Sequence, residues 1–252
     1  MLSTNFLRHH LPKVIAALVL TFVSGVVDIV GYLGILHFFT AHLTGTTVEL
    51  GRGFVERAPA DIYAALTIVA AFVAGSVLGR ALIEAASRHK YRRVASFTLA
   101  IEAILLAVVG GSHAGLGTSP YVELALLAAA MGIQTATLTG IGPLTVHTTF
   151  VTGMVNKAAQ LISRVGFRVY DRWRWGALNA EARNSQQKDK QMLALLIGVW
   201  VLYVAGAAAG TWAFLRWEMR VLLFAIALLG VVLATDQIWP LSIEEEKEQS
   251  ER

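Results

Sequence analysis

Long apolar stretches separated by short polar or charged segments make up most of this chain. Six of them are long enough to cross a bilayer as helices, which takes about 20 residues each. They run over Lys13–Leu36, Asp61–Ala85, Val94–Gly111, Tyr121–Gly140, Gln191–Phe214 and Met219–Ile238. The pattern therefore predicts an all-α membrane protein with six transmembrane helices.

Two further stretches, His37–Glu56 and Pro143–Gly166, are moderately apolar but rich in Thr, His and Gly. Their pattern fits re-entrant segments, broken half-helices or full spans. Basic residues are concentrated in Arg80–Arg93 and Arg164–Lys190, whereas Ser112–Pro120 is uncharged. Because basic loops stay in the cytoplasm, both ambiguous segments are expected to return to the side they enter from. Six spans with both termini in the cytoplasm then place both basic loops in the cytoplasm and the uncharged loop outside.

The composition agrees with this topology. Hydrophobic residues make up 56% of the chain and charged residues 15%, whereas a soluble domain has about 25% charged residues. The net charge of +4 belongs to loops between apolar spans, so it does not indicate a nucleic acid partner. The chain has no cysteine, which excludes disulfides and thiolate metal sites. Residues 241–252 are predicted to form a disordered acidic tail.

Several short motifs recur in the same order in residues 1–115 and 116–240. A Thr-Gly pair follows a histidine twice, as Thr44-Gly45 and as Thr152-Gly153. Val-Ala-Gly with a second glycine four residues later also occurs twice, with Gly75 and Gly79 and with Gly206 and Gly210. An Ala-Ile pair follows each of them, at Ala100-Ile101 and at Ala225-Ile226. A unit of three spans is odd, so its tandem copy enters from the opposite side. The sequence therefore predicts two inverted three-helix repeats, each with a broken or re-entrant Thr-Gly segment.

Polar side chains inside the apolar segments are the candidates for a site. Asp28 and Glu102 lie within predicted spans, where an ionised carboxylate costs about 2.5–3.5 kcal/mol. The functional interpretation is proton coupling or cation binding, and the alternative is a hydrogen bond between helices. The remaining candidates surround the Thr-Gly pairs and the end of the fourth span: His42, Thr44, Gly45, Thr46, Gln134, His147, Thr149, Thr152, Gly153 and Asn156. No metal or other cofactor is expected.

Four short segments of the chain resemble the YoaK-like family, a bacterial group of multi-span proteins of unknown function. The similar segments are Ser24–Asp28, Phe39–Thr47, Ala130–Gln134 and His147–Gly153. Thr46 replaces the asparagine that usually follows the glycine of the family motif, so no asparagine contact carries over. The resemblance implies a location in the bacterial inner membrane and supplies no substrate.

The leading hypothesis is a small secondary transporter of a small polar or anionic solute, coupled to protons through Asp28 or Glu102. A passive channel, and a partner or enzymatic role in the membrane, are the alternatives. No nucleophile, base and orienting group occur together, so an enzyme is not expected. Arg164–Lys190 fits either an interfacial helix on anionic lipid or a solvated connector. Six spans make a small carrier, which favours a homodimer.

Overall fold

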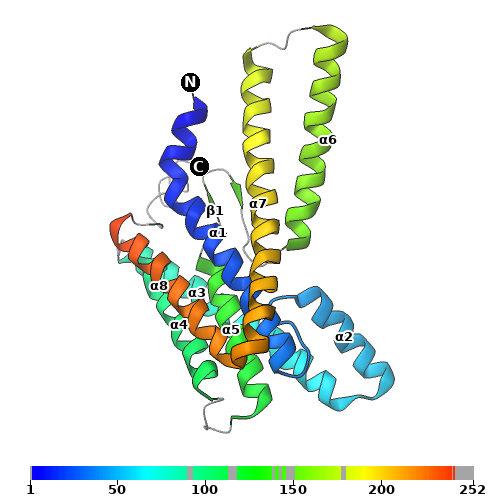
Figure 1. Ribbon diagram of the computed structural model, residues 1–252, viewed down its shortest axis with the longest axis vertical. Helices are drawn as coiled ribbons and strands as arrows, with labels where there is room; N and C mark the ends of the chain where they lie inside the picture. The colour runs from blue at the N-terminus through cyan, green and yellow to red at the C-terminus, as the bar shows by residue number, and fades with distance from the viewer. Residues whose placement is uncertain are drawn as a thin grey trace.

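The computed structural model describes residues 2–89, 93–112, 118–137, 140–141, 144–145, 151–176, 180–239 and 241. Helices make up nearly all of this part of the chain (Figure 1). They are α1 (Leu2–Gly34), α2 (Leu43–Glu56), α3 (Pro59–Arg88), α4 (Val94–Ser112), α5 (Pro120–Thr137), α6 (Val151–Trp175), α7 (Ala180–Trp217), the 3₁₀ turn η1 (Glu218–Val221) and α8 (Leu222–Ile238). One small departure from an all-α fold is an antiparallel pair of two-residue strands, β1 (Gly140–Ile141) and β2 (Leu144–Thr145).

Within the described residues, four helical stretches are long and apolar enough to cross a membrane. They are Leu11–Gly34, Pro59–Arg88, Val94–Gly111 and Ser185–Ile238, the last of which includes α7, η1 and α8. Large apolar side chains on these helices point outward, among them Val73, Val77, Phe97, Ile104, Trp212, Leu215, Phe224 and Val231. Lipid is the environment in which such an outer surface is stable. The chain is therefore a membrane protein with several spans.

The fourth predicted span gives the 18-residue helix α5, which is not among those four stretches. Most of α5 is buried inside the bundle, including the polar residues Glu123 and Gln134. A helix enclosed by other helices needs less apolar surface than one that faces lipid. The six predicted spans are all helical, but the count of six spans stays a prediction.

Two helix pairs form the closest contacts of the bundle: α1 packs on α7, and α3 packs on α5. Glycines make both approaches possible. A Cβ on Gly206 would overlap the backbone of Phe22, and a Cβ on Gly75 would overlap the backbone of Ala129. The small residues that the sequence showed in two of the spans are therefore helix contacts.

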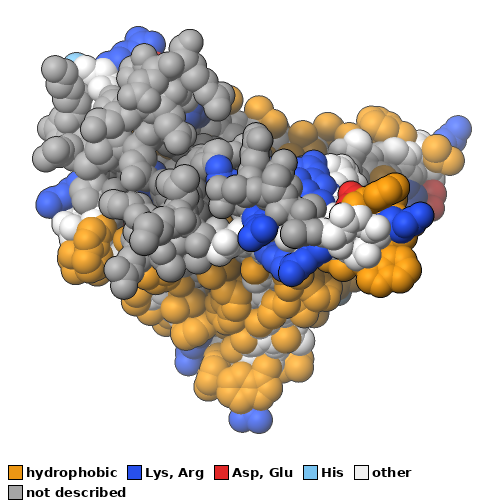
Figure 2. Space-filling view, turned by 90° about the horizontal axis from the view of Figure 1, so that it is seen from above, with side chains coloured by type: hydrophobic (Ala, Val, Ile, Leu, Met, Phe, Trp, Pro, Cys, Tyr) orange, Lys and Arg blue, Asp and Glu red, His pale blue; other side chains and the backbone are white. Residues whose placement is uncertain are grey.

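The two ends of the bundle carry different segments. The start of α1 and the facing ends of α6 and α7 lie toward one end, and α2 lies in the opposite half (Figure 1). Seen from the first end, Lys and Arg side chains face the viewer, and hydrophobic side chains line the flanks (Figure 2). This arrangement is typical of a protein whose polar end emerges from a membrane.

The segment Arg164–Lys190 is mainly helical and is divided between two helices. α6 runs through its first part to Trp175, and α7 begins at Ala180, so the two form a helical hairpin. Arg168 donates to Asp189 across the hairpin at 2.6 Å, and Arg164 lies 3.7 Å from the same carboxylate. The aromatic side chains Trp173 and Trp175 are exposed. Contact of this basic, aromatic hairpin with anionic lipid stays a prediction.

Candidate functional site

The segment after α1 turns back toward the bundle. Leu36 and His37 both have positive φ values, 50° and 57°, which reverse the direction of the chain. The ring of Phe39 then stacks on Tyr32 with 4.6 Å between centroids. Gly31 has no side chain to obstruct this return, and a Cβ there would lie 2.7 Å from Cγ2 of Thr40. Residues 37–41 therefore run back along the last two turns of α1.

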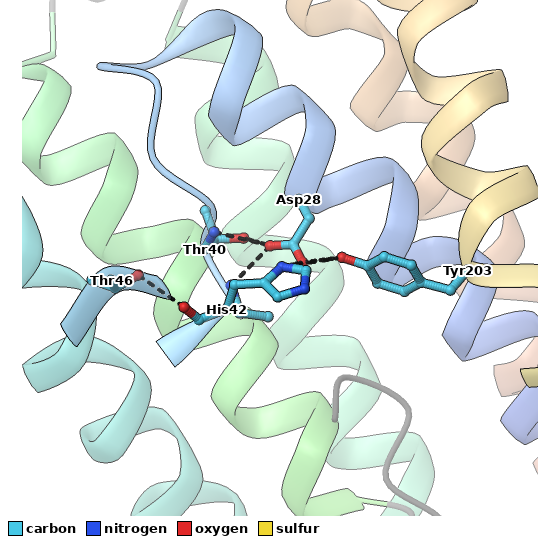
Figure 3. Close-up of polar contacts among 6 residues, drawn as sticks. Asp28, Thr40, His42, Thr46 and Tyr203 are labelled. Carbon is cyan, nitrogen blue, oxygen red and sulfur yellow. Dashed lines mark hydrogen bonds and ion pairs between the residues drawn. The ribbon is translucent and has the colours of Figure 1, made fainter. Parts of the chain in front are cut away.

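The carboxylate of Asp28 holds this returning segment (Figure 3). Oδ1 accepts hydrogen bonds from the backbone N–H of Thr40 at 2.9 Å, the Thr40 hydroxyl at 2.9 Å and the N–H of Ala41 at 2.8 Å. Oδ2 accepts the hydroxyl of Tyr203, on α7, at 2.5 Å and lies 3.3 Å from Nδ1 of His42. Asp28 is 2% exposed. One buried carboxylate thus connects α1, the returning segment and α7.

The depth of Asp28 explains why the segment needs a carboxylate. Asp28 lies six residues before the end of the apolar stretch Leu11–Gly34, which corresponds to about 9 Å along a helix. Backbone N–H groups at that depth find no water, and an unsatisfied one costs several kcal/mol. Thr40 and Ala41 donate theirs to Asp28 instead. The expectation that the first Thr-Gly segment returns to the side it left agrees with this geometry.

His42 stands between the buried carboxylate and the surface. Its side chain is 34% exposed, its ring packs on Phe39 and Tyr203, and its Nδ1 lies 3.4 Å from the Tyr203 hydroxyl. The hydrogen bond with Asp28 raises the pKa of His42 above its usual value, an effect that outweighs partial burial. His42 is therefore a basic group in direct contact with both a buried carboxylate and the exterior.

The other candidates of the first half lie on α2 and α4. α2 begins directly after His42. Thr46 is buried and donates its hydroxyl to the His42 carbonyl at 3.1 Å, so that hydroxyl is committed to its own helix. Thr44 and Gly45 are exposed, and a Cβ on Gly45 would meet no atom within 4 Å. Glu102, on α4, is completely buried.

The candidates of the second half are not gathered around Asp28. Gln134 is buried on α5 and donates to Ser24 at 2.7 Å and to the Leu20 carbonyl at 2.9 Å. Thr152, Gly153 and Asn156 lie at the start of α6, outside the hydrogen-bonded cluster of Asp28. His147 and Thr149 lie outside the described residues. The described part of the chain contains no group of three or more His, Cys, Asp or Glu side chains placed to hold a metal ion, so no metal centre is assigned.

Tyr203 and Thr40 belong to the site but were not predicted from the sequence. Tyr203 lies 175 residues from Asp28 in the chain, and a single tyrosine within an apolar span is not a distinctive signal. Thr40 was visible only as part of a Thr- and His-rich stretch. Gly31, three residues after Asp28, was a usable signal in the sequence, because a glycine on a helix allows another segment to approach it closely.

The fold and this site define a membrane protein with several spans and a buried polar cluster between its helices. The chain belongs to the family described as a protein of unknown function, DUF1275, whose model matches residues 16–235. It is 26% identical over 212 residues to the UPF0700 transmembrane protein YoaK of Bacillus subtilis (strain 168), covering 81% of this chain and 88% of that protein. The resemblance to the YoaK-like family is thereby confirmed. No solved structure matches the chain.

Proposed function

We propose that this protein is a small secondary transporter of a small polar or anionic solute, coupled to protons. The observation that carries the proposal is the cluster of Asp28, His42 and Tyr203. A buried carboxylate and a partly exposed histidine meet there, between a returning segment and a helix from later in the chain. Carriers commonly build their substrate and coupling sites from interrupted helices and buried ionisable groups.

Two inverted repeats are the second part of the proposal, and the packing of glycines supports it. A Cβ on Gly25 would touch Tyr203 and Ala207, and a Cβ on Gly132 would touch Phe72 and Ser76. The two pairs of contacted residues correspond, because Tyr203 and Ala207 lie 131 positions after Phe72 and Ser76. Both α1–α7 and α3–α5 are therefore one type of contact made twice, which a pseudo-two-fold axis would generate.

The partners on the other side of these contacts follow the same rule. Gly75 approaches the backbone of Ala129, and Gly206 approaches that of Phe22; Gly79 packs on Ile133, and Gly210 packs on Val26. These contacted residues also correspond, because Ala129 and Ile133 lie 107 positions after Phe22 and Val26. In each contact, the first helix of one half packs on the third helix of the other half: α1 packs on α7, and α5 packs on α3. Rocking one half against the other would then expose the site alternately to each side.

The arrangement of the ends supports six spans with both termini in the cytoplasm. The start of α1 and the basic α6–α7 hairpin lie toward one end of the bundle, and the last turn of α8 points toward that end (Figure 1). The positive-inside rule assigns that end to the cytoplasm. His42 then opens toward the outer half of the membrane, because α2 leads away from that basic end.

Solute-driven proton movement in proteoliposomes tests the proposal. The purified protein is reconstituted with a pH-sensitive dye in the lumen, and a panel of small carboxylates, phosphate, amino acids and sugars is added outside. A coupled solute is expected to change the luminal pH only in vesicles that contain the protein. If no solute in the panel moves protons and none exchanges across the membrane, the proposal fails.

Counterflow separates a carrier from the passive channel that is the alternative. Vesicles preloaded with unlabelled solute are expected to accumulate labelled solute transiently, because a carrier returns loaded with either form. A channel gives conductance without this transient accumulation. Asp28→Asn tests the coupling: proton-driven uptake unchanged by that substitution would remove Asp28 from the coupling step.

A further inference from the structure

Glu102 differs from every other buried acid in the described part of the chain. Asp28, Glu123, Asp189 and Asp236 each accept hydrogen bonds from side-chain or backbone donors. Both carboxyl oxygens of Glu102 are enclosed and have no donor among the described residues. The side chain is 0% exposed. This carboxyl group is therefore placed where a charge has nothing to stabilise it.

The position of Glu102 makes that burial expensive for the ionised form. It lies eight residues into the apolar stretch Val94–Gly111, about 12 Å from the start of α4 and close to the middle of its length. Leu99 and Leu106, which precede and follow it on the same helix, are completely buried. A carboxylate without a partner at this depth is far less stable than the neutral acid.

Polar side chains connect the neighbourhood of Glu102 with that of Asp28. Thr98, one turn before Glu102, accepts a hydrogen bond from Thr137 on α5 at 2.8 Å. Gln134, one turn before Thr137, donates to Ser24 on α1. Ser24 in turn precedes Asp28 by one helical turn.

These hydroxyl and amide groups lie on α4, α5 and α1 and are buried or partly buried, so the core around Glu102 and Asp28 contains a connected series of polar side chains.

We propose that Glu102 is the proton-binding carboxyl of the transport cycle and that Asp28 is a fixed anchor for the returning segment. Glu102 holds a proton in the conformation described here. When the bundle opens to one side, the proton passes from the Glu102 hydroxyl to water, and the carboxylate takes a proton from water on the other side. Asp28 keeps its donors throughout. This inference rests on the proposed transport function for the cycle, but the protonation of Glu102 is measured without it.

Infrared spectroscopy of the whole protein in liposomes measures that protonation. The carbonyl stretch of a neutral carboxylic acid is separate from the bands of carboxylates, and the wild type is expected to show it at neutral pH. Glu102→Gln, which copies the shape of the neutral acid, should abolish the band. Glu123→Gln is the matched control, because Glu123 is also buried, at 5% exposed, but accepts the Thr118 hydroxyl at 2.7 Å. That control and Asp28→Asn should both keep the band.

Uptake in proteoliposomes then tests the cycle. Glu102→Gln is expected to lose proton-driven accumulation while it retains solute exchange, because the variant has no proton to release. Glu123→Gln should accumulate solute as the wild type does. An infrared band that survives in Glu102→Gln, or accumulation in that variant with the wild-type dependence on pH, overturns the inference. If the wild type moves no solute, the proposed function fails, and the infrared band alone decides whether Glu102 holds a proton.

Discussion

Replacing Asp28 by alanine tests whether this carboxylate holds the returning segment. The substitution removes the acceptor of the Thr40 and Ala41 N–H groups. A buried donor left without a partner costs about 1–3 kcal/mol, so the two amides together cost about 2–6 kcal/mol. With about 1.4 kcal/mol for each factor of ten, the detached state of the segment should become about 30-fold to 10⁴-fold more populated.

Cysteine labelling measures that population directly, because the chain contains no cysteine of its own. Ala41→Cys introduces a thiol at a position that is 8% exposed, and a membrane-impermeant maleimide reports each opening. Labelling should be at least about 30-fold faster in the Asp28→Ala background, by the same arithmetic.

Thr21→Ala is the matched control for this measurement. Thr21 is a buried polar residue of α1 whose hydroxyl bonds only to its own helix, at the Ala17 carbonyl. Its loss should leave the labelling rate of the introduced cysteine unchanged. Equal labelling rates in the Asp28→Ala and wild-type backgrounds would refute the anchoring role.

Three further predictions follow from the same structure. Gly206→Ala should abolish folded protein in a detergent gel-filtration assay, because its Cβ would overlap the backbone of Phe22, whereas Gly45→Ala, with open space around it, should elute as the wild type does. Tyr203→Phe removes a hydrogen bond to a charged group and should cost about 1.5–3 kcal/mol, seen as a lower midpoint of thermal unfolding; an unchanged midpoint would contradict it. The hydrogen bond with Asp28 raises the pKa of His42 in the folded protein. The stability that this contact gives to the returning segment is therefore complete below the unfolded pKa of about 6.5 and is lost as pH rises through the folded pKa. The labelling rate of the introduced cysteine, divided by its rate in a His42→Gln background, should therefore increase above about pH 6.5, and a ratio independent of pH would refute the contact.

The sequence was most informative about features that depend on local composition. Apolar stretches such as Val94–Gly111 must be helices in lipid, because each backbone group has to find its partner within the segment. The recurrence of Gly75 and Gly79 as Gly206 and Gly210 indicated close helix contacts for a similar reason, since only small residues allow two backbones to approach. A charged side chain in an apolar stretch, such as Asp28, also stands out without any knowledge of the fold.

The sequence was less informative where a position depends on residues far away in the chain. It could not distinguish the roles of Asp28 and Glu102, because both are single acids inside predicted spans. The difference lies in their surroundings: Asp28 receives donors from the returning segment and from α7, and Glu102 receives none from the described residues. The pairing of α6 with α7 as a helical hairpin was also missed, because its basic residues resembled a loop.

By itself, then, the sequence determined that the chain lies in a membrane, that its six longest apolar stretches are helical and which polar side chains lie within them. Only the tertiary structure decided what those side chains contact. Three separate parts of the chain meet here: Asp28 on α1, the Thr40 and Ala41 amides that donate to one of its oxygens, and the Tyr203 hydroxyl that donates to the other. Hydropathy is a property of a segment, whereas the stability of a buried charge depends on donors that only folding brings within reach.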